Sequence, residues 1–186
     1  MLHFWDASWP LIVDKCPCDV HFVEWLEQER IAGAAIFHFG TGEHHVIAKR
    51  LAETNSDNRL YGVTASKNEY QTYIDLAVAD PEVARRYNVV FCDIYLLDRK
   101  LLPVFDVVTL FHLGEFWNEK NAAYGAMTDR QLTELMLDRM PKGGKLLVYT
   151  GSYAFDKAEA VVDALEAAGR LIREPDFKTL RVYRKA

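Results

Sequence analysis

The feature that most constrains the fold is a repeated alternation of short apolar runs with longer amphipathic segments. Runs typical of strands occur at 34–39, 60–64, 88–92, 106–111 and 145–150, and two more, at 170–174 and 178–184, end the chain. Helical segments are expected after the first, second and fourth runs, whereas the stretch between the third and fourth runs is turn-like around Pro103. The third and fourth runs lack strict alternation of apolar and polar residues, which is typical of strands covered on both faces.

This order predicts an α/β fold with a doubly wound, mostly parallel seven-stranded sheet, because right-handed crossovers leave little alternative. Helices should cover both faces, and the last two strands should form a C-terminal antiparallel hairpin. Thr128 and Gln131 have the spacing of a capping box at a helix start, and Asp156 and Glu159 repeat a similar signal.

The length of 186 residues is that of one domain, since domains cluster near about 100 to 200 residues. We therefore expect a single domain over 1–186, with the alternating core at 32–186. Residues 1–31 precede the alternation and should contain a helix that starts near Asp19, as a cover over the mouth of a site. His3, Trp5, Asp6 and Trp9 form a cluster typical of either a lid or a frayed terminus.

Charge and cysteine content exclude several classes of protein. There are 22 Lys plus Arg against 27 Asp plus Glu, a net charge of -5, so the dense basic face of a nucleic-acid-binding protein is not expected. Three cysteines do not make a disulfide framework, and apolar runs are too short to cross a membrane. We expect a cytoplasmic protein without a membrane or nucleic-acid partner, with a homodimer as its candidate assembly.

A glycine turn, His38-Phe39-Gly40-Thr41-Gly42-Glu43-His44, joins the first strand to its helix. Glycines let a backbone approach a ligand closely at the positive end of a helix, although the same turn also serves packing without a ligand. A nucleotide-binding dehydrogenase is disfavoured, because His45 and Thr64 stand where that motif needs a third glycine and an acid.

From about Ile36 to the C-terminus the sequence resembles the class I S-adenosylmethionine-dependent methyltransferases. The matching segments, in chain order, are HFGTGEH, LYGVTAS, VVFCDIY, FDVVTLFHLGEF and MPKGGKLLVY. The resemblance implies that core 32–186 binds S-adenosylmethionine. The cofactor-binding residues that it implies are His38, Gly40, Thr41, Gly42, His44, Thr64, Asp93, Ile94 and Phe111.

Within this set, the resemblance implies that Gly40 and Gly42 wrap the methionine part and that Asp93 holds the adenine amino group. Three positions depart from the family pattern. His38 replaces the first acid, His44 replaces the third glycine, and Thr64 replaces the acid that binds the ribose. Glu69 is a candidate substitute for that missing acid.

His112 and Glu115 are the candidate catalytic residues, because they follow the fourth strand directly. A sulfonium methyl group is already activated, so the enzyme has to align an acceptor and remove its proton, and the histidine pKa suits that task. His112 could equally cap the strand or pack beneath the adenine. The pair His44-His45 is favoured as solvated or packing residues. The aromatic residues expected near an acceptor, or as cover over the sheet edge, are Trp117, Tyr124, Tyr149 and Tyr153.

The spacing of Cys16, Cys18 and His21 is a candidate metal motif. A four-ligand zinc site needs another matched pair, and none is nearby in the sequence, so no metal is expected.

The predicted function is methyl transfer to an oxygen or nitrogen of a small-molecule acceptor. The alternatives are another S-adenosylmethionine-consuming reaction on the same fold, or a catalytically degenerate binding subunit.

Overall fold

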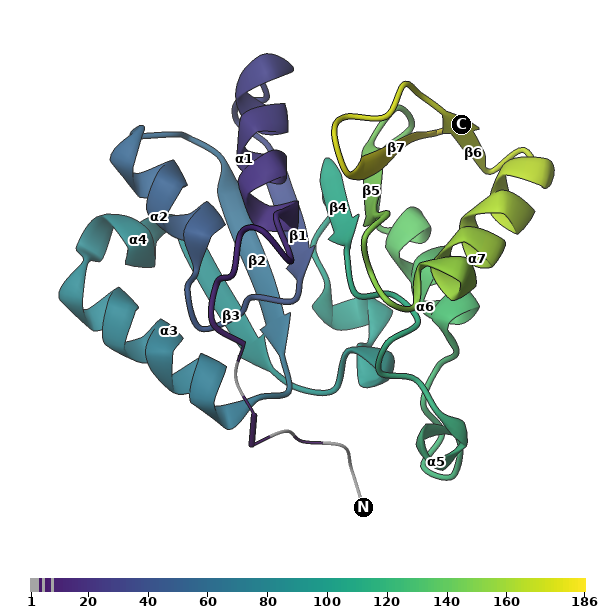
Figure 1. Ribbon diagram of the computed structural model, residues 1–186, viewed down its shortest axis with the longest axis horizontal. Helices are drawn as coiled ribbons and strands as arrows, with labels where there is room; N and C mark the ends of the chain where they lie inside the picture. Colours follow the sequence, from purple (N-terminus) through teal and green to yellow (C-terminus); the bar gives the residue numbers. More distant parts are fainter. Residues whose placement is uncertain (1–3, 5, 8) are drawn as a thin grey trace.

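The computed structural model describes residues 4, 6, 7 and 9–186, and these form a seven-stranded sheet with the order β3-β2-β1-β4-β5-β7-β6 (Figure 1). The first five strands pair in parallel, whereas β7 runs antiparallel to both β5 and β6. The strands are β1 (Ala35–Phe39), β2 (Arg59–Thr64), β3 (Tyr87–Phe91), β4 (Val107–Leu110), β5 (Lys145–Tyr149), β6 (Leu171–Arg173) and β7 (Leu180–Lys185). The predicted fold class is confirmed.

Each of the predicted crossovers contains a helix or short helical turns. The elements are α1 (Cys18–Gln28), α2 (Val46–Glu53), α3 (Lys67–Ala79), α4 (Pro81–Arg86), the 3₁₀ turns η1 (Ile94–Leu96) and η2 (Arg99–Leu101), α5 (Glu119–Ala122), α6 (Asp129–Asp138) and α7 (Phe155–Ala167). No helix among the described residues is both long enough and apolar enough to cross a membrane.

Two apolar cores lie on opposite faces of the sheet, because successive strand residues point to opposite sides. On β1, Ile36 packs in the core under α1, α2 and α4, whereas Phe37 packs in the core under η1, α6 and α7. On β5, Leu147 packs in the same core as Ile36, and Leu146 packs in the same core as Phe37. The lack of alternation in the apolar runs is thus explained, since both sides of the central strands are buried.

Of the two helix starts predicted from capping signals, the one at Thr128 is confirmed and the one at Asp156 is not. At α6 the Thr128 side chain accepts a hydrogen bond from the backbone of Gln131, whose side chain accepts one from Thr128 in return. The prediction for α7 is wrong, because that helix begins at Phe155 after Ala154, which provides no side-chain cap. Asp156 lies instead in the first turn, where its negative charge interacts favourably with the positive end of the helix dipole.

The α6 cap can be tested by replacing Thr128. We expect Thr128→Ala to lower the free energy of unfolding by about 1 kcal/mol, because backbone donors of the first turn lose their partner. Urea denaturation followed by circular dichroism measures this change. Thr128→Ser is the matched control, since it keeps the hydroxyl, and an equal loss in both variants would contradict the capping role.

Candidate functional site

A cavity of about 400 Å³ opens at the carboxyl ends of the five parallel strands. The loop after each strand contributes to its wall, through Gly40 after β1, Thr64 on β2, Asp93 after β3, His112 after β4 and Gly151 after β5. Strand order reverses between β1 and β4, and adjacent loops diverge there. Open α/β sheets bind their ligands at this position.

The glycine turn after β1 needs its two glycines for reasons of conformation and of space. Gly40 has a φ of +99° and Gly42 a φ of +55°, both in the left-handed region. A Cβ atom on Gly40 would lie 2.2 Å from Cδ2 of His112, and one on Gly42 would lie 2.4 Å from Nε2 of His44. The turn therefore brings its backbone directly against two imidazole rings in the cavity wall.

At the end of β2, where Thr64 replaces the acid of the family pattern, the Glu69 carboxylate lies beside the strand. The Thr64 hydroxyl donates a hydrogen bond of 2.7 Å to Oε2 of Glu69, and the Thr41 hydroxyl donates one of 3.3 Å to the same atom. Ser66 is the N-cap of α3, and its side chain accepts a hydrogen bond from the backbone N–H of Glu69. Glu69 therefore lies in the first turn of α3, and its carboxylate reaches back to Thr64 on the strand. Burial raises the pKa of Glu69 despite the two hydroxyl donors.

At the end of β3 the Asp93 side chain is buried in the cavity wall beside Ile94. One carboxylate oxygen accepts a hydrogen bond of 3.0 Å from the backbone of Tyr95, and the other accepts one of 2.6 Å from the Tyr124 hydroxyl. Each oxygen has two lone pairs, so Asp93 can accept a further donor from a ligand in the cavity.

After β4, His112 and Glu115 form a pair. Nδ1 of His112 lies 3.1 Å from a carboxylate oxygen of Glu115, and the Ser152 hydroxyl donates a 2.6 Å bond to the other oxygen. Burial alone would lower the pKa of His112, but the hydrogen bond and charge of Glu115 outweigh it and raise that pKa. Burial likewise opposes ionisation of Glu115, and the hydrogen bond with His112 outweighs it and lowers the pKa of Glu115.

Three predicted cofactor residues lie beneath the cavity wall, not in it. The lining residues do not include His38, Thr41 or Phe111. The His38 ring is buried on the α1 side of the sheet, where Nδ1 lies 2.8 Å from the Thr109 hydroxyl and Nε2 lies 3.6 Å from Asp19. Burial lowers the pKa of His38 to about 3, so this ring is neutral.

Asp19 in α1 is a functional candidate that the sequence pattern did not reveal. It lines the cavity and its carboxylate lies 3.7 Å from Nδ1 of His44, which also lines the cavity. Burial raises the pKa of Asp19 to about 7. His44 and its neighbour His45 both have a lowered pKa, primarily because they are buried. Both ring nitrogens of His45 lie within hydrogen-bond distance of hydroxyl groups, those of Tyr87 and Thr72, so this ring has a structural role.

The described residues before α1 contribute to the cavity wall. Among them, Trp9, Pro10, Leu11 and Ile12 line the cavity, and Asp6 pairs with Lys67 at 2.9 Å. The predicted lid residues His3 and Trp5 lie outside the described residues. Of the predicted acceptor aromatics, Tyr149 and Tyr153 line the cavity, whereas Tyr124 contacts Asp93 and Trp117 is not a lining residue.

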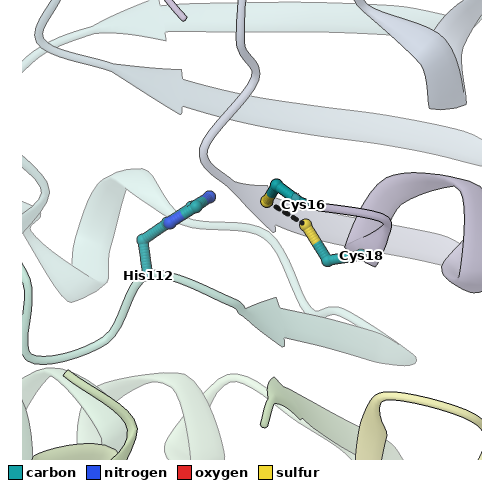
Figure 2. A group of neighbouring side chains, drawn as sticks. All are labelled: Cys16, Cys18 and His112. Carbon is teal, nitrogen blue, oxygen red and sulfur yellow. Dashed lines mark hydrogen bonds between the residues drawn. The ribbon is translucent and has the colours of Figure 1, made fainter. Parts of the chain in front are cut away.

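Cys16, Cys18 and His112 all line the cavity, and Figure 2 shows the two cysteines beside the His112 ring. Their sulfur atoms are 3.4 Å apart, and one ligand atom from each of the three residues lies within 4.8 Å of the others. The hydrogen bond with Cys18 lowers the pKa of the Cys16 thiol, although burial opposes this shift. The cysteine spacing was visible in the sequence, but its partner comes from a strand end far along the chain.

Comparisons with known proteins identify the fold. The sequence matches no model of a known protein family and no curated protein. Among solved structures, the chain is similar to the CcbJ methyltransferase from Streptomyces caelestis, with a TM-score of 0.66 and 13% identity over 96% of this chain and 93% of that one. It is also similar to the N-methyltransferase NodS from Bradyrhizobium japonicum, determined with S-adenosyl-L-homocysteine, with a TM-score of 0.62 and 14% identity over 93% of this chain and 90% of that one.

A third similar structure is TrmN from Thermus thermophilus, with a TM-score of 0.60 and 14% identity over 88% of this chain. The chain spans about half of the length of TrmN, 47%. Together with the strand order, these similarities show that the chain has the class I methyltransferase fold.

The close approach of Gly40 to His112 can be tested with Gly40→Ala. We expect the free energy of unfolding to fall by about 1 to 3 kcal/mol, because alanine is strained at the positive φ of this position. The clash with the His112 ring, which Glu115 holds in place, should lower it further. Gly125→Ala is the matched control, because Gly125 has a φ of +78° and open space around it. Thermal denaturation should show a melting temperature lower by at least about 2 °C in Gly40→Ala than in the control. Equal melting temperatures would contradict the contact.

Proposed function

We propose that this chain binds S-adenosylmethionine and transfers its methyl group to an oxygen or nitrogen atom of a small-molecule acceptor. The observation that carries the proposal is a pair of buried carboxylates in one cavity, Glu69 beside the end of β2 and Asp93 after β3. In the family that the sequence resembles, an acid for the ribose and an acid for the adenine follow these two strands, and Glu69 stands in for the acid that Thr64 replaces. The shared fold with a structure that contains S-adenosyl-L-homocysteine supports the same ligand.

The residues present fit this cofactor. Gly40 and Gly42 let the backbone approach the methionine part without a side chain in between. Glu69, held by the hydroxyls of Thr64 and Thr41, accepts hydrogen bonds from the ribose hydroxyls, and Asp93 accepts one from the adenine amino group. Ile94 and His44 add to the same wall, whereas His38, Thr41 and Phe111 support it from below.

The cofactor supplies an activated sulfonium methyl group when it is bound, so the protein has to hold the acceptor in line and remove its proton. Nδ1 of His112 is engaged by Glu115, which leaves Nε2 to accept the proton. The Glu115 carboxylate then stabilises the positive imidazolium, and Ser152 holds that carboxylate in position. Tyr149 and Tyr153 contribute aromatic surface for the acceptor.

A small acceptor is favoured by charge and by the cover over the cavity. The chain carries a net charge of -5, whereas a nucleic-acid acceptor calls for a basic face. Trp9 to Ile12 form part of the cavity wall, which leaves less room for a folded macromolecule.

Calorimetric titration with S-adenosylmethionine and with S-adenosylhomocysteine tests the proposal without a guessed acceptor. We expect micromolar binding of at least one ligand, after which amines, phenols and carboxylates can be screened as acceptors. No binding by a folded sample would contradict the proposal and favour a degenerate subunit. Thiomethyladenosine as product, in place of S-adenosylhomocysteine, would instead indicate another reaction of the same cofactor.

Replacement of Asp93 tests the adenine site. We expect Asp93→Ala to weaken the binding of S-adenosylhomocysteine by about 1 to 3 kcal/mol, or about 5- to 150-fold, because a charged hydrogen-bond partner is lost. Asp98→Ala is the matched control, because Asp98 caps η2 as Asp93 caps η1 but does not line the cavity. An unchanged dissociation constant in Asp93→Ala would contradict the assignment.

Replacement of Glu69 tests the ribose site. We expect Glu69→Gln to weaken the binding of S-adenosylhomocysteine by about tenfold or more, because hydrogen bonds to a charged acceptor are worth about 1.5 to 3 kcal/mol. The comparison ligand is S-adenosylhomocysteine without its ribose hydroxyls, which should bind the wild-type protein and Glu69→Gln equally. A similar loss for both ligands would place Glu69 away from the ribose.

A further inference from the structure

Three potential metal ligands meet at one point of the cavity wall. Cys16 and Cys18 stand at the start of α1, and His112 follows β4, so the fold joins segments that are far apart in sequence. Their ligand atoms lie within 4.8 Å of one another, a spread that small side-chain rotations can close around a metal ion. Two thiolates and an imidazole are typical ligands of Zn²⁺.

The orientation of His112 suits a metal ligand. Its Nδ1 lies 3.1 Å from Glu115, so Nε2 is the nitrogen that remains free to coordinate. The outer edge of the ring points toward Cys16 in Figure 2. A histidine that binds a metal usually donates its other N–H to a carboxylate or carbonyl, which fixes the ring and raises its basicity. Glu115 provides that carboxylate, and Ser152 in turn holds Glu115.

The surroundings favour a site that is open on one side. Cys18 is buried, Cys16 and His112 are partly buried, and all three line the cavity. A metal ion held between them would have three protein ligands and one remaining position, and the cavity borders all three ligands. Three protein ligands with one open position are the arrangement of catalytic zinc, in contrast to the closed four-ligand arrangement of structural zinc.

We propose that Cys16, Cys18 and His112 bind one Zn²⁺ ion whose open coordination position faces the cavity. The metal site itself goes beyond the proposed function and does not depend on it. Where the same cavity also holds S-adenosylmethionine, the acceptor binds at the open position and releases its proton to solvent, because a bound cation lowers the pKa of its ligands. His112 is then a metal ligand and accepts no proton.

Metal titration of the purified, reduced chain tests the site. We expect one Zn²⁺ per chain, measured by competition with a chromophoric chelator. Co²⁺ in its place should show sulfur-to-cobalt charge-transfer absorption and the intense visible bands of a tetrahedral ion. Absence of Zn²⁺ binding, or Co²⁺ without the charge-transfer absorption, would overturn the proposal. A mass lower by two hydrogen atoms in the chain as isolated, with no metal bound after reduction, would identify a Cys16–Cys18 disulfide pair instead.

Variants assign the ligands. Cys16→Ser, Cys18→Ser and His112→Asn should each abolish the tetrahedral Co²⁺ spectrum. Cys92→Ser is the matched control, because Cys92 lies on the same cavity but outside the cluster, and it should still bind one metal ion. Glu115→Gln keeps all three ligands and should weaken Zn²⁺ binding by about 10- to 100-fold. Retention of the spectrum in Cys16→Ser, or its loss in a folded Cys92→Ser, would contradict the assignment.

Titration of the metal-free and zinc-loaded proteins with S-adenosylhomocysteine separates the two proposals. Binding of that ligand by a protein that takes up no Zn²⁺ would overturn the metal site alone. Zinc uptake by a protein that binds neither S-adenosylmethionine nor S-adenosylhomocysteine would overturn the proposed function alone.

Discussion

The parallel pairing of β1 with β4 is the contact on which the site depends. Residues 36–39 of β1 run in register with residues 107–110 of β4, so both strands end at the same edge of the sheet. Beyond this edge one chain continues into the glycine turn and the other into His112, and the ring of His112 lies directly against Gly40. The crossovers from these two strands leave in opposite directions along the sheet, and the cavity lies between their loops.

Burial under α1 determines the electrostatics of one side of the cavity. Asp19 lies near His38 and His44, and desolvation drives the pKa of Asp19 up to about 7 and that of His38 down to about 3. Near neutral pH, His38 is therefore a neutral hydrogen-bonding group, not a charged one. The N-terminal segment is thus tied to the sheet by polar contacts as well as by the packing of Phe22 on Phe111.

His112 is the residue that the two proposals share. With Glu115 behind it, its free nitrogen can accept a proton from an acceptor or coordinate a metal ion with the two cysteines, but it cannot do both at once. Either role uses the same geometry, in which a carboxylate fixes one ring nitrogen and directs the other into the cavity. The fold thus places His112 directly after β4, and the two carboxylates that we propose for the cofactor, Glu69 and Asp93, lie beside the ends of β2 and β3.

The sequence by itself determined the strand and helix order, the glycine turn and the position of Asp93 after β3, because periodicity and turn chemistry are local properties of the chain. Tertiary structure decided which side chains face the cavity. Alternation along β1 turns His38 under α1, where its ring meets Asp19. Cys16 and Cys18 meet His112 because α1 packs on Phe111, directly after β4. Such contacts depend on register and packing between distant segments, which no local pattern contains.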